Sequence, residues 1–326
     1  MRIVMYFTVL AYRDALLAEL NDAPEEIVVV ASPEELADAI EGADVFIFNG
    51  SAYTAEVAEI VRTRGRSVRW YHSSSAGNEP LITIGVPRHV TVTRSGGHSA
   101  PIVAEHAIAL LLGLARGLPY AMENQRKRNW IRVRGGPRPG TMRSLFGRTA
   151  VVLGFSHIGQ EIARRLRVLG MTVIAVTRSG RPQELADETY PSTQLKEALA
   201  KASVLVVAAP ANVETRGMIG AEELASLQPD GFVVNIGRGP IIDTAAIEAA
   251  LRDGTILGAG LDVIDPEPLP SEHSLWDAPN LIITPHRAGG GDPTSAQRQA
   301  EAVLQNLARF RANQPLQHVL KTNIID

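Results

Sequence analysis

The sequence predicts an α/β fold built from two doubly wound parallel sheets. Short apolar runs alternate with amphipathic helical segments in two series, one within about the first 95 residues and one from residue 149 onward. The runs are continuously apolar, which is typical of parallel strands covered by helices on both faces. A length of 326 residues and a hydrophobic content of 45% agree with two domains that each bury a core.

The first series predicts strands that alternate with helices from the start of the chain. The strands are expected at Arg2–Phe7, Glu26–Ala31, Val45–Gly50, Val68–Ser73 and Val90–Arg94, and the helices at Ala11–Leu20, Pro33–Ile40 and Ala55–Val61. The apolar start is followed by charged residues and has no small-residue cleavage pattern, so we interpret it as a strand and not as a signal peptide. Because no targeting segment is found, the expected location is the cytoplasm.

The second series repeats this pattern. Its strands are expected at Thr149–Gly154, Thr172–Thr177, Val204–Ala209, Phe232–Gly237, Gly258–Val263 and Leu281–Thr284, and its helices at Gln160–Leu169, Thr193–Lys201, Ala221–Leu227 and Thr244–Arg252. A long apolar helix, Ile102–Gly117, links the two series, and a last helix runs from an N-cap at Asp292 to about Arg311 and returns to the first unit. The predicted domains are residues 1–98 with 290–326, and residues 99–289 inserted between them.

Charge and composition exclude several classes of partner and site. The formal net charge of −3 provides no excess positive charge to recruit nucleic acid or an anionic membrane. The absence of cysteine rules out disulfides, thiolate metal sites and a cysteine nucleophile, and agrees with a reducing compartment. Charged residues interrupt the stretch Ile102–Leu118, which is also too short to span a bilayer comfortably, so we interpret it as a buried helix. No metal site is expected, since six histidines lack metal-ligand spacing and receive no chemical role: His72, His89, His98, His106, His273 and His318.

A glycine loop after the first strand of the second series indicates a dinucleotide site. Gly154 permits the tight turn that leaves the strand, Gly159 lets the next helix pack closely, and Ser156 replaces the usual middle glycine. The helix start offers free N–H groups and a positive dipole end to a pyrophosphate. The alternative is a strand–turn–helix that needs its glycines only for packing. The expected contacts are Gly154, Ser156, His157, Ile158 and Gly159.

The end of the next strand favours NADP over NAD. NAD enzymes usually carry an acidic residue there that bonds the ribose hydroxyls, whereas this chain has Thr177. Without a carboxylate, a 2′-phosphate meets no repulsion, and Arg178 and Ser179, with Arg181 close behind, can hold it by charge-assisted hydrogen bonds. The alternative is a solvated polar turn. We therefore expect NADP(H) as the preferred cofactor, with NAD(H) also permitted.

Three side chains at or beyond predicted strand ends match the needs of 2-oxo acid reduction. Each alone is a weak signal, because a single arginine or histidine is more often structural. Together, Arg238 can bind a carboxylate bidentately, His286 can protonate a developing alkoxide, and Glu267 can orient the imidazole. Open α/β sheets place ligand sites at these carboxyl ends, where Asp262 also stands.

Three motifs in this series resemble those of a known enzyme family. Asn235–Asp243 looks like NxxRGxxxD, Gly260–Val263 followed by Glu267-Pro268 is similar to ALDVFxxEP, and Thr284–Gly289 resembles TPHxAG. All three are motifs of the D-isomer-specific 2-hydroxyacid dehydrogenases, and their order and spacing agree. With the glycine loop and the helix containing Ala104-Glu105-His106, the resemblance covers nearly the whole chain.

The resemblance implies a Rossmann cofactor domain inserted into a flavodoxin-like substrate domain, and it implies a role for each motif residue. Arg238 is expected to bind the substrate carboxylate, His286 to donate the proton in reduction, and Glu267 to pair with His286. The expected contacts of the nicotinamide carboxamide are Ile236, Asp262 and Gly289, of which Asp262 contributes its side chain. We also assign Ala209, Pro210 and Thr215 to the cofactor site.

A loop in the first series resembles the AGVD loop on which the family binds the substrate carboxylate. Ala76 and Gly77 fit this motif and are expected to contribute backbone N–H groups, whereas Asn78 and Glu79 depart from it and leave the substrate's shape open. The stretch Trp70–Gly77 is similar to the glyoxylate/hydroxypyruvate reductase branch.

The resulting prediction is an NADP-preferring oxidoreductase that reduces a small 2-oxo acid, glyoxylate- or hydroxypyruvate-like, to the D-2-hydroxy acid in a cleft between the domains. The alternatives are a dehydrogenase for a bulkier 2-oxo acid and a dinucleotide-sensing corepressor or scaffold without turnover. The joint presence of Arg238, Glu267 and His286 argues against the second alternative.

Two further features concern partners. The apolar helix Ile102–Gly117, together with the resemblance, predicts a homodimer. The segment Arg126–Arg138 holds six basic residues and no acid, and we interpret it either as a solvated loop or as a border of the cleft that attracts anionic substrate. Within it, Trp130 is a candidate for substrate specificity, because a tryptophan at a similar place in the family can reach a partner subunit's active site.

Overall fold

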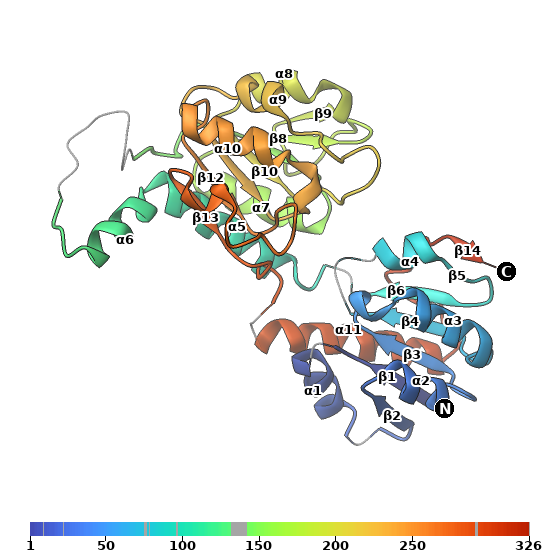
Figure 1. Ribbon diagram of the computed structural model, residues 1–326. Coiled ribbons are helices and arrows are strands. Elements are labelled where there is room, and N and C mark those ends of the chain that lie inside the picture. Colours follow the sequence, from blue (N-terminus) through green and yellow to red (C-terminus); the bar gives the residue numbers. More distant parts are fainter. Residues whose placement is uncertain are drawn as a thin grey trace. The chain divides into compact units, whose positions relative to one another are not determined.

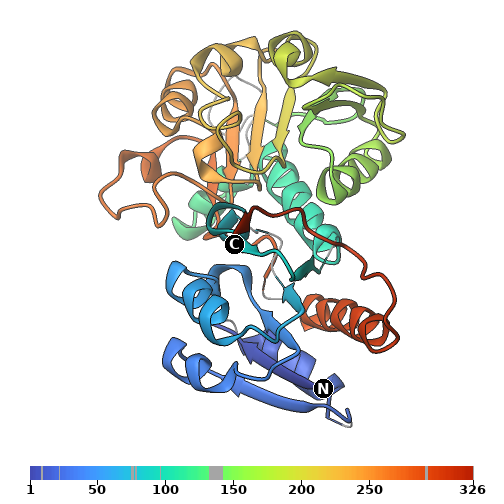
Figure 2. The same ribbon diagram turned by 90° about the vertical axis from the view of Figure 1, so that its right-hand side faces the viewer.

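The computed structural model describes residues 1–8, 10–21, 23–74, 77, 79–95, 97–131, 142–290 and 293–325. The chain divides into two compact units, which Figure 1 and Figure 2 colour along the sequence. Unit 1 contains Met1–Ser99 and Gly290–Asp326, and unit 2 contains Ala100–Gly289. The assignment of a substrate role to unit 1 and a cofactor role to unit 2 stays a prediction.

Unit 1 is an all-parallel sheet with helices on both faces (Figure 1). Its strand order is β2-β1-β3-β4-β6, with bounds β1 (Arg2–Tyr6), β2 (Glu26–Val30), β3 (Val45–Phe48), β4 (Trp70–Ser73) and β6 (Thr91–Arg94). On one face, Leu16 of α1 (Leu10–Glu19) and Val303 of α11 (Pro293–Arg311) share a core cluster with Trp70. The other face carries α2 (Pro33–Ala39) and α3 (Ala55–Arg64).

Side-chain caps define the starts of two helices in unit 1. The shortest elements of this unit have no sequence signal that predicts them. Ser32 and Thr54 cap α2 and α3 by accepting hydrogen bonds from the backbone N–H groups of Glu35 and Val57. The sequence pattern does not predict α4 (Glu79–Ile84), β5 (Val86–Pro87) or β14 (Ile324–Ile325). Since β5 and β14 pair with each other over only two residues each, they are too short to show a hydrophobic period.

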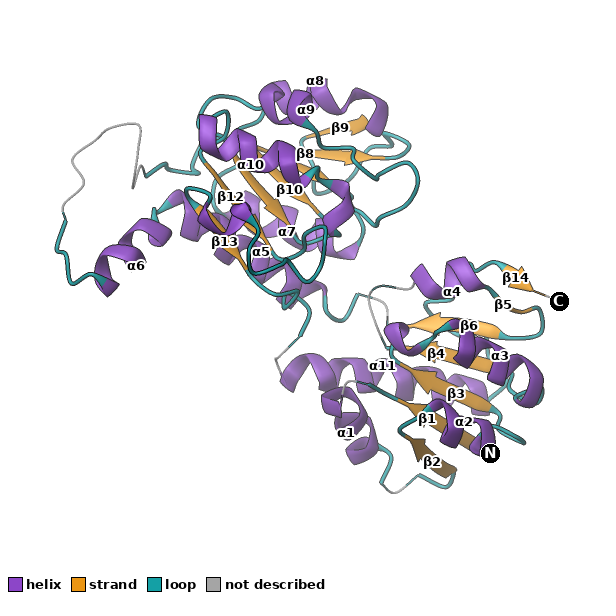
Figure 3. Cartoon of the chain, viewed as in Figure 1, coloured by secondary structure: helices purple, strands orange, loops and turns teal. Residues whose placement is uncertain are grey.

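Unit 2 is a larger all-parallel sheet in the order β13-β12-β11-β10-β7-β8-β9 (Figure 3). Its strands are β7 (Thr149–Leu153), β8 (Thr172–Thr177), β9 (Glu188–Pro191), β10 (Val204–Val207), β11 (Phe232–Asn235), β12 (Gly258–Leu261) and β13 (Leu281–Ile283). One face carries α5 (Ala100–Ala115) and α7 (His157–Val168), and the other carries α8 (Leu195–Ala200), α9 (Ala221–Ser226) and α10 (Thr244–Asp253). The strands run outward from β7 in both directions, which confirms the predicted doubly wound fold.

The apolar helix α5 belongs to the core of unit 2. Val103, Ala107, Leu111 and Leu114 are buried, the helix packs against strands β11, β12 and β13 and against α7, and the shorter α6 (Leu118–Arg126) follows directly. None of the described helices is by itself long and apolar enough to cross a membrane, and α5 and α6 pass that test only as a pair bent by 70°.

A buried chain of hydrogen bonds joins β4 and β6 in unit 1. Trp70 Nε1 donates to Thr93 Oγ1 at 2.8 Å, and Thr93 Oγ1 lies 2.8 Å from His72 Nδ1. A hydroxyl group can donate one hydrogen bond and accept two, and His72 Nε2 lies 3.2 Å from Ser95 Oγ, so each ring nitrogen of neutral His72 has a hydroxyl partner. Burial, with repulsion from His98 and His318, lowers the pKa of His72 to about 3.

Replacing His72 with Gln tests this neutral, buried state. The ordinary pKa of histidine is 6.5, so below that pH only the unfolded chain takes up a proton, and unit 1 loses stability as the pH falls toward 3. Between pH 7 and pH 5 this loss is about 2 kcal/mol. Glutamine can accept from Thr93 and donate to Ser95 without charging, so the variant's pH dependence should be shallower by that amount. Hydrogen exchange of the β4 amides, corrected for intrinsic rates, measures the difference, and equal pH dependence would contradict the assignment.

Candidate functional site

The carboxyl edge of the unit 2 sheet collects the residues predicted to bind cofactor and substrate. Since all its strands are parallel, their carboxyl ends meet at one edge. Gly154 follows β7, Arg238 follows β11, Asp262 follows β12 and His286 follows β13. Strand order reverses between β7 and β10, and doubly wound folds bind ligands at such switch points.

The loop from β7 into α7 is built from close backbone contacts. Gly154 has a φ of +90°, and a Cβ atom there would lie 2.7 Å from the backbone of Ala209. A Cβ atom at Gly159 would lie 2.1 Å from the Gly154 carbonyl oxygen. Both positions therefore require glycine, which brings the helix start against the strand ends.

The first turn of α7 presents unused backbone donors. Its first hydrogen bond runs from the Gln160 N–H to the Ser156 oxygen at 2.9 Å, which leaves the N–H groups of His157, Ile158 and Gly159 without partners inside the helix. Ser156 and His157 are exposed, and the Ser156 side chain makes no capping bond. This turn can therefore hold an anionic group by backbone N–H groups and the helix dipole.

The turn after β8 presents two arginines. Thr177 Oγ1 accepts a hydrogen bond from the Gly180 N–H at 3.0 Å, so the Thr177 side chain shapes the turn. Arg178, Ser179 and Arg181 are exposed, and within the described part of the chain neither guanidinium forms an ion pair. The turn thus has positive charge available and no carboxylate at the strand end.

The loop after β10 is held by its own side chains. Thr215 Oγ1 donates to the Pro210 oxygen at 2.8 Å and accepts from the Asn212 N–H at 2.9 Å. Ala209 is buried against Gly154, and a Cβ atom at Gly237 would lie 2.7 Å from the Ala209 oxygen. Thr215 therefore shapes the loop with its hydroxyl, while Ala209 lies between the cofactor loop and the end of β11.

His286 and Glu267 form a close pair. His286 Nδ1 lies 2.6 Å from Glu267 Oε1, and both side chains are partly exposed, at 48% and 41%. An ionised carboxylate only accepts hydrogen bonds, so Nδ1 carries the proton toward Glu267 and Nε2 is left for another partner. His286 has a φ of +51°, and its N–H donates to the Asp262 carbonyl oxygen at 2.8 Å.

Arg238 is held beside the same segment. Arg238 is half-buried, and its backbone is extended. The Arg238 Nη1 donates to the Gly237 carbonyl oxygen at 2.7 Å, and Asn235 Nδ2 donates to the Arg238 carbonyl oxygen at 3.1 Å. A Cβ atom at the next residue, Gly239, would lie 2.0 Å from the Ile264 oxygen. The backbone that follows Arg238 therefore touches the segment that leads to Glu267, and only glycine permits this contact.

Asp262 is nearly fully buried and surrounded by donors. Its Oδ1 accepts from Thr284 Oγ1 at 2.6 Å and from the Arg287 N–H at 2.8 Å, and its Oδ2 accepts from the Ala288 N–H at 2.9 Å. His106 Nε2 lies 3.3 Å from Oδ1. Burial raises the pKa of Asp262, but the hydrogen bonds from His106, Thr284 and the two backbone N–H groups outweigh it and lower the pKa to about 2.

Sequence reasoning missed His106 and treated Thr284 only as part of a motif. Thr284 stands two residues before His286, so its contact has a local signal. His106 comes from α5, 178 residues away from Thr284, and no local pattern links the two.

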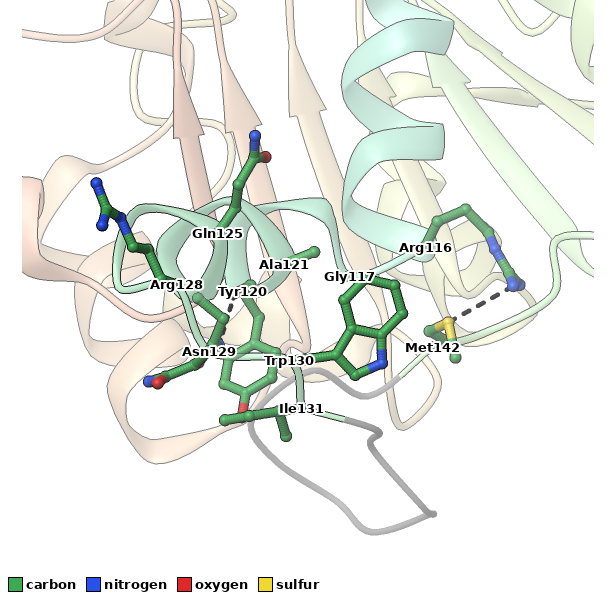
Figure 4. Close-up of a pocket in the computed structure, with 11 residues that line it drawn as sticks. Arg116, Gly117, Tyr120, Ala121, Gln125, Arg128, Asn129, Trp130, Ile131 and Met142 are labelled. Carbon is green, nitrogen blue, oxygen red and sulfur yellow. Dashed lines mark hydrogen bonds between the residues drawn. The ribbon is translucent and has the colours of Figure 1, made fainter.

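Several residues of the predicted site lie outside the part of the chain that the structure describes. Ala76, Ser75, Asn78, Asp292 and the part of the basic segment from 132 to 138 lie outside the described residues, while Gly77 is described and half-buried. Trp130 is 92% exposed and lines a hollow of about 720 Å³ at the end of α6. Figure 4 shows Trp130 among the residues that line this hollow, with Arg116 directed toward Met142.

Comparison with known proteins identifies relatives of this chain. Residues 108–288 match the family described as D-isomer specific 2-hydroxyacid dehydrogenase, NAD binding domain. A glyoxylate reductase from Pyrococcus furiosus is 35% identical over 229 residues, 69% of this chain and 67% of that protein. A glycerate dehydrogenase from Methylorubrum extorquens is 28% identical over 93% of this chain and 94% of its own. The crystal structure of an NADPH-dependent glyoxylate/hydroxypyruvate reductase from Sinorhizobium meliloti, in complex with NADP and sulfate, is 26% identical, covers 98% of each chain and superposes with a TM-score of 0.82.

Replacing Gly154 with Ala should destabilise unit 2 by more than about 2 kcal/mol and weaken dinucleotide binding at least about 10-fold, because the methyl group would strike the Ala209 backbone. Gly147→Ala is the matched control, since Gly147 has a similar φ of +74° but no atom within 4 Å of an added Cβ. The control should lose only about 1 kcal/mol for its left-handed backbone. Urea unfolding and fluorescence titration measure both effects, and equal losses in the two variants would refute the packing argument.

Proposed function

Because the chain belongs to the D-isomer-specific 2-hydroxyacid dehydrogenase family, we propose that it reduces a small 2-oxo acid to the D-2-hydroxy acid with NADPH as the preferred reductant. The comparisons confirm the family expected from the motifs and make the protein an oxidoreductase. The observation that carries the proposal is the contact of 2.6 Å between His286 and Glu267, at the sheet edge that also presents Arg238 and the dinucleotide loop.

The residues present fit a dinucleotide. The Gly154 loop has no side chain between its backbone and Ala209, and the α7 N–H groups of His157 and Ile158 are available to a pyrophosphate. The reduced nicotinamide, when bound, supplies the hydride for C2 of the substrate. In this proposal Ile236, Asp262 and Gly289 border the nicotinamide, while Ala209, Pro210 and Thr215 border the remainder of the cofactor.

Three side chains of this protein bind the substrate, donate the proton and orient the proton donor. Arg238 binds the substrate carboxylate through paired N–H donors and so fixes the 2-oxo group. His286 donates a proton from Nε2 to the substrate oxygen as negative charge develops there. Glu267 accepts the Nδ1 hydrogen bond, which fixes the orientation of the ring and stabilises the protonated imidazole before the transfer.

The turn after β8 supports a preference for NADP. Arg178 and Arg181 are exposed without ion pairs among the described residues, and Ser179 adds a hydroxyl donor. The absence of an acid at Thr177 removes the usual repulsion of a 2′-phosphate. A structural relative with NADP bound agrees with this assignment, and NAD(H) remains a permitted, weaker cofactor.

The relatives named for glyoxylate, hydroxypyruvate and glycerate favour a small substrate. In the proposal, backbone N–H groups at Ala76 and Gly77 assist Arg238 in binding the carboxylate. The D configuration of the product follows from the family to which the chain belongs.

We also propose a homodimer, but on different grounds from those given by the sequence. Most of the larger apolar residues of α5 are buried within unit 2, and Ile102, Ile108 and Leu112 are only partly exposed, so α5 offers little apolar surface to a second chain. Exposed apolar side chains occur instead along and after α6, at Leu118, Met122, Trp130 and Ile131. Such patches commonly mark association surfaces, and a solution mass of two chains is the observation that this part of the proposal needs.

NADPH consumption should be measured with glyoxylate, hydroxypyruvate, pyruvate and phenylpyruvate. We expect the highest kcat/KM with the first two acids. The variant Arg238→Gln should bind NADPH normally but lose at least about 100-fold in turnover, because its carboxylate clamp is removed. The highest rate with phenylpyruvate would indicate a bulkier substrate, and NADPH binding without consumption of any acid would indicate a dinucleotide sensor.

Replacing Arg178 with Ala should raise the KM for NADPH about 10- to 100-fold, the loss expected for a charged hydrogen bond, and leave the KM for NADH nearly unchanged. Arg66→Ala, which removes an exposed arginine from unit 1, serves as the control for general charge effects. Equal losses with both cofactors would reject contact between Arg178 and the 2′-phosphate.

A further inference from the structure

A chain of hydrogen bonds runs from α5 to the turn that carries His286. His106 Nε2 lies 2.9 Å from Thr284 Oγ1, and Thr284 Oγ1 lies 2.6 Å from Asp262 Oδ1. The carboxylate only accepts, so the single hydroxyl hydrogen of Thr284 points to Asp262. Thr284 then accepts from His106, whose Nε2 must carry the ring proton.

Asp262 in turn accepts hydrogen bonds from the backbone N–H groups of three successive residues that start at His286. The His286 N–H donates to the Asp262 carbonyl oxygen at 2.8 Å, the Arg287 N–H to Oδ1 at 2.8 Å and the Ala288 N–H to Oδ2 at 2.9 Å. His286 has a left-handed backbone with a φ of +51°, which an L residue adopts at a cost of about 1 kcal/mol or more. Three hydrogen bonds to one residue hold this strained turn.

The position of Asp262 favours a supporting role. Its side chain is only 1% exposed, whereas that of His106 is 24% exposed. A buried carboxylate must receive donors to stay ionised, and Asp262 receives them from the turn, from Thr284 and from His106. The anchor of this set is rigid, because α5 residues Val103 and Ala107, on either side of His106, are buried in the core of unit 2.

We propose that His106 and Thr284 are positioning residues, which fix the Asp262 carboxylate and, through it, the turn that presents His286 to the substrate. The inference rests on the proposed function and adds a supporting set to it. It assigns a task to a histidine that the sequence analysis left without one. If the dominant role of Asp262 were direct contact with the nicotinamide carboxamide, loosening its support would weaken cofactor binding first.

The kinetic test uses paired variants. Thr284→Val and His106→Leu remove the two links, whereas Thr284→Ser and His106→Gln keep a hydroxyl and an N–H donor near the same places. We expect the first pair to lower kcat with glyoxylate about 10- to 100-fold, with the Kd for NADPH changed less than about 2-fold, since a slightly misplaced proton donor slows chemistry without affecting the pyrophosphate or 2′-phosphate contacts. The solvent isotope effect on kcat should increase, and the conservative pair should recover most of the loss.

A second measurement does not depend on turnover. Amide hydrogen exchange at Arg287 and Ala288 should accelerate about 10-fold or more in Thr284→Val and His106→Leu, relative to wild type and to the conservative pair, while exchange in β7 stays unchanged. Failure of the wild type to reduce any 2-oxo acid would reject the proposed function, and the exchange rates would still test the positioning set. Unchanged exchange, or a weaker Kd for NADPH with an unchanged kcat, would overturn the inference.

Discussion

Parallel pairing of the unit 2 strands is the constraint on which the candidate site depends. Because neighbouring strands run in the same direction, residues separated by more than a hundred positions leave the sheet at one edge. The Gly154 loop, Arg238 and His286 share that edge for this reason. The strand order reverses between β7 and β10, so the connections that follow these two strands run to opposite sides of the sheet. Doubly wound folds bind ligands in the crevice that such a reversal leaves at the carboxyl edge.

Close backbone contacts at three glycines fix the positions of the loops at this edge of the sheet. Gly154, Gly237 and Gly239 each stand where a Cβ atom would meet another backbone segment within 2.7 Å. These contacts join the Gly154 loop to the β10 end, the β10 end to β11, and β11 to the segment before Glu267. A single methyl group at any of them would separate neighbouring parts of the candidate site, so the fold stability of unit 2 and the geometry of that site rest on the same atoms.

Buried polar groups complete this arrangement in both units. In unit 1, His72 stays neutral between two hydroxyl groups because the surroundings disfavour its charge. In unit 2, Asp262 stays ionised because the Thr284 hydroxyl, His106 and two backbone N–H groups donate to its carboxylate. The difference follows from partners: hydroxyl groups satisfy a neutral ring, whereas backbone N–H groups and a hydroxyl hydrogen stabilise an anion.

The sequence by itself determined the doubly wound α/β class, most strand and helix positions and the family, because apolar runs, glycine spacing and motif order are local and repeat along the chain. It also identified His286 and Glu267 as partners, although their contact of 2.6 Å required the structure. Only tertiary packing decided that His106 reaches Thr284 across 178 residues, that Thr215 is used within its own loop, and that the apolar face of α5 is covered by its own sheet. These outcomes depend on which surfaces come into contact after the strands pair. Contacts between residues that are far apart in the sequence leave no local pattern from which they could be predicted.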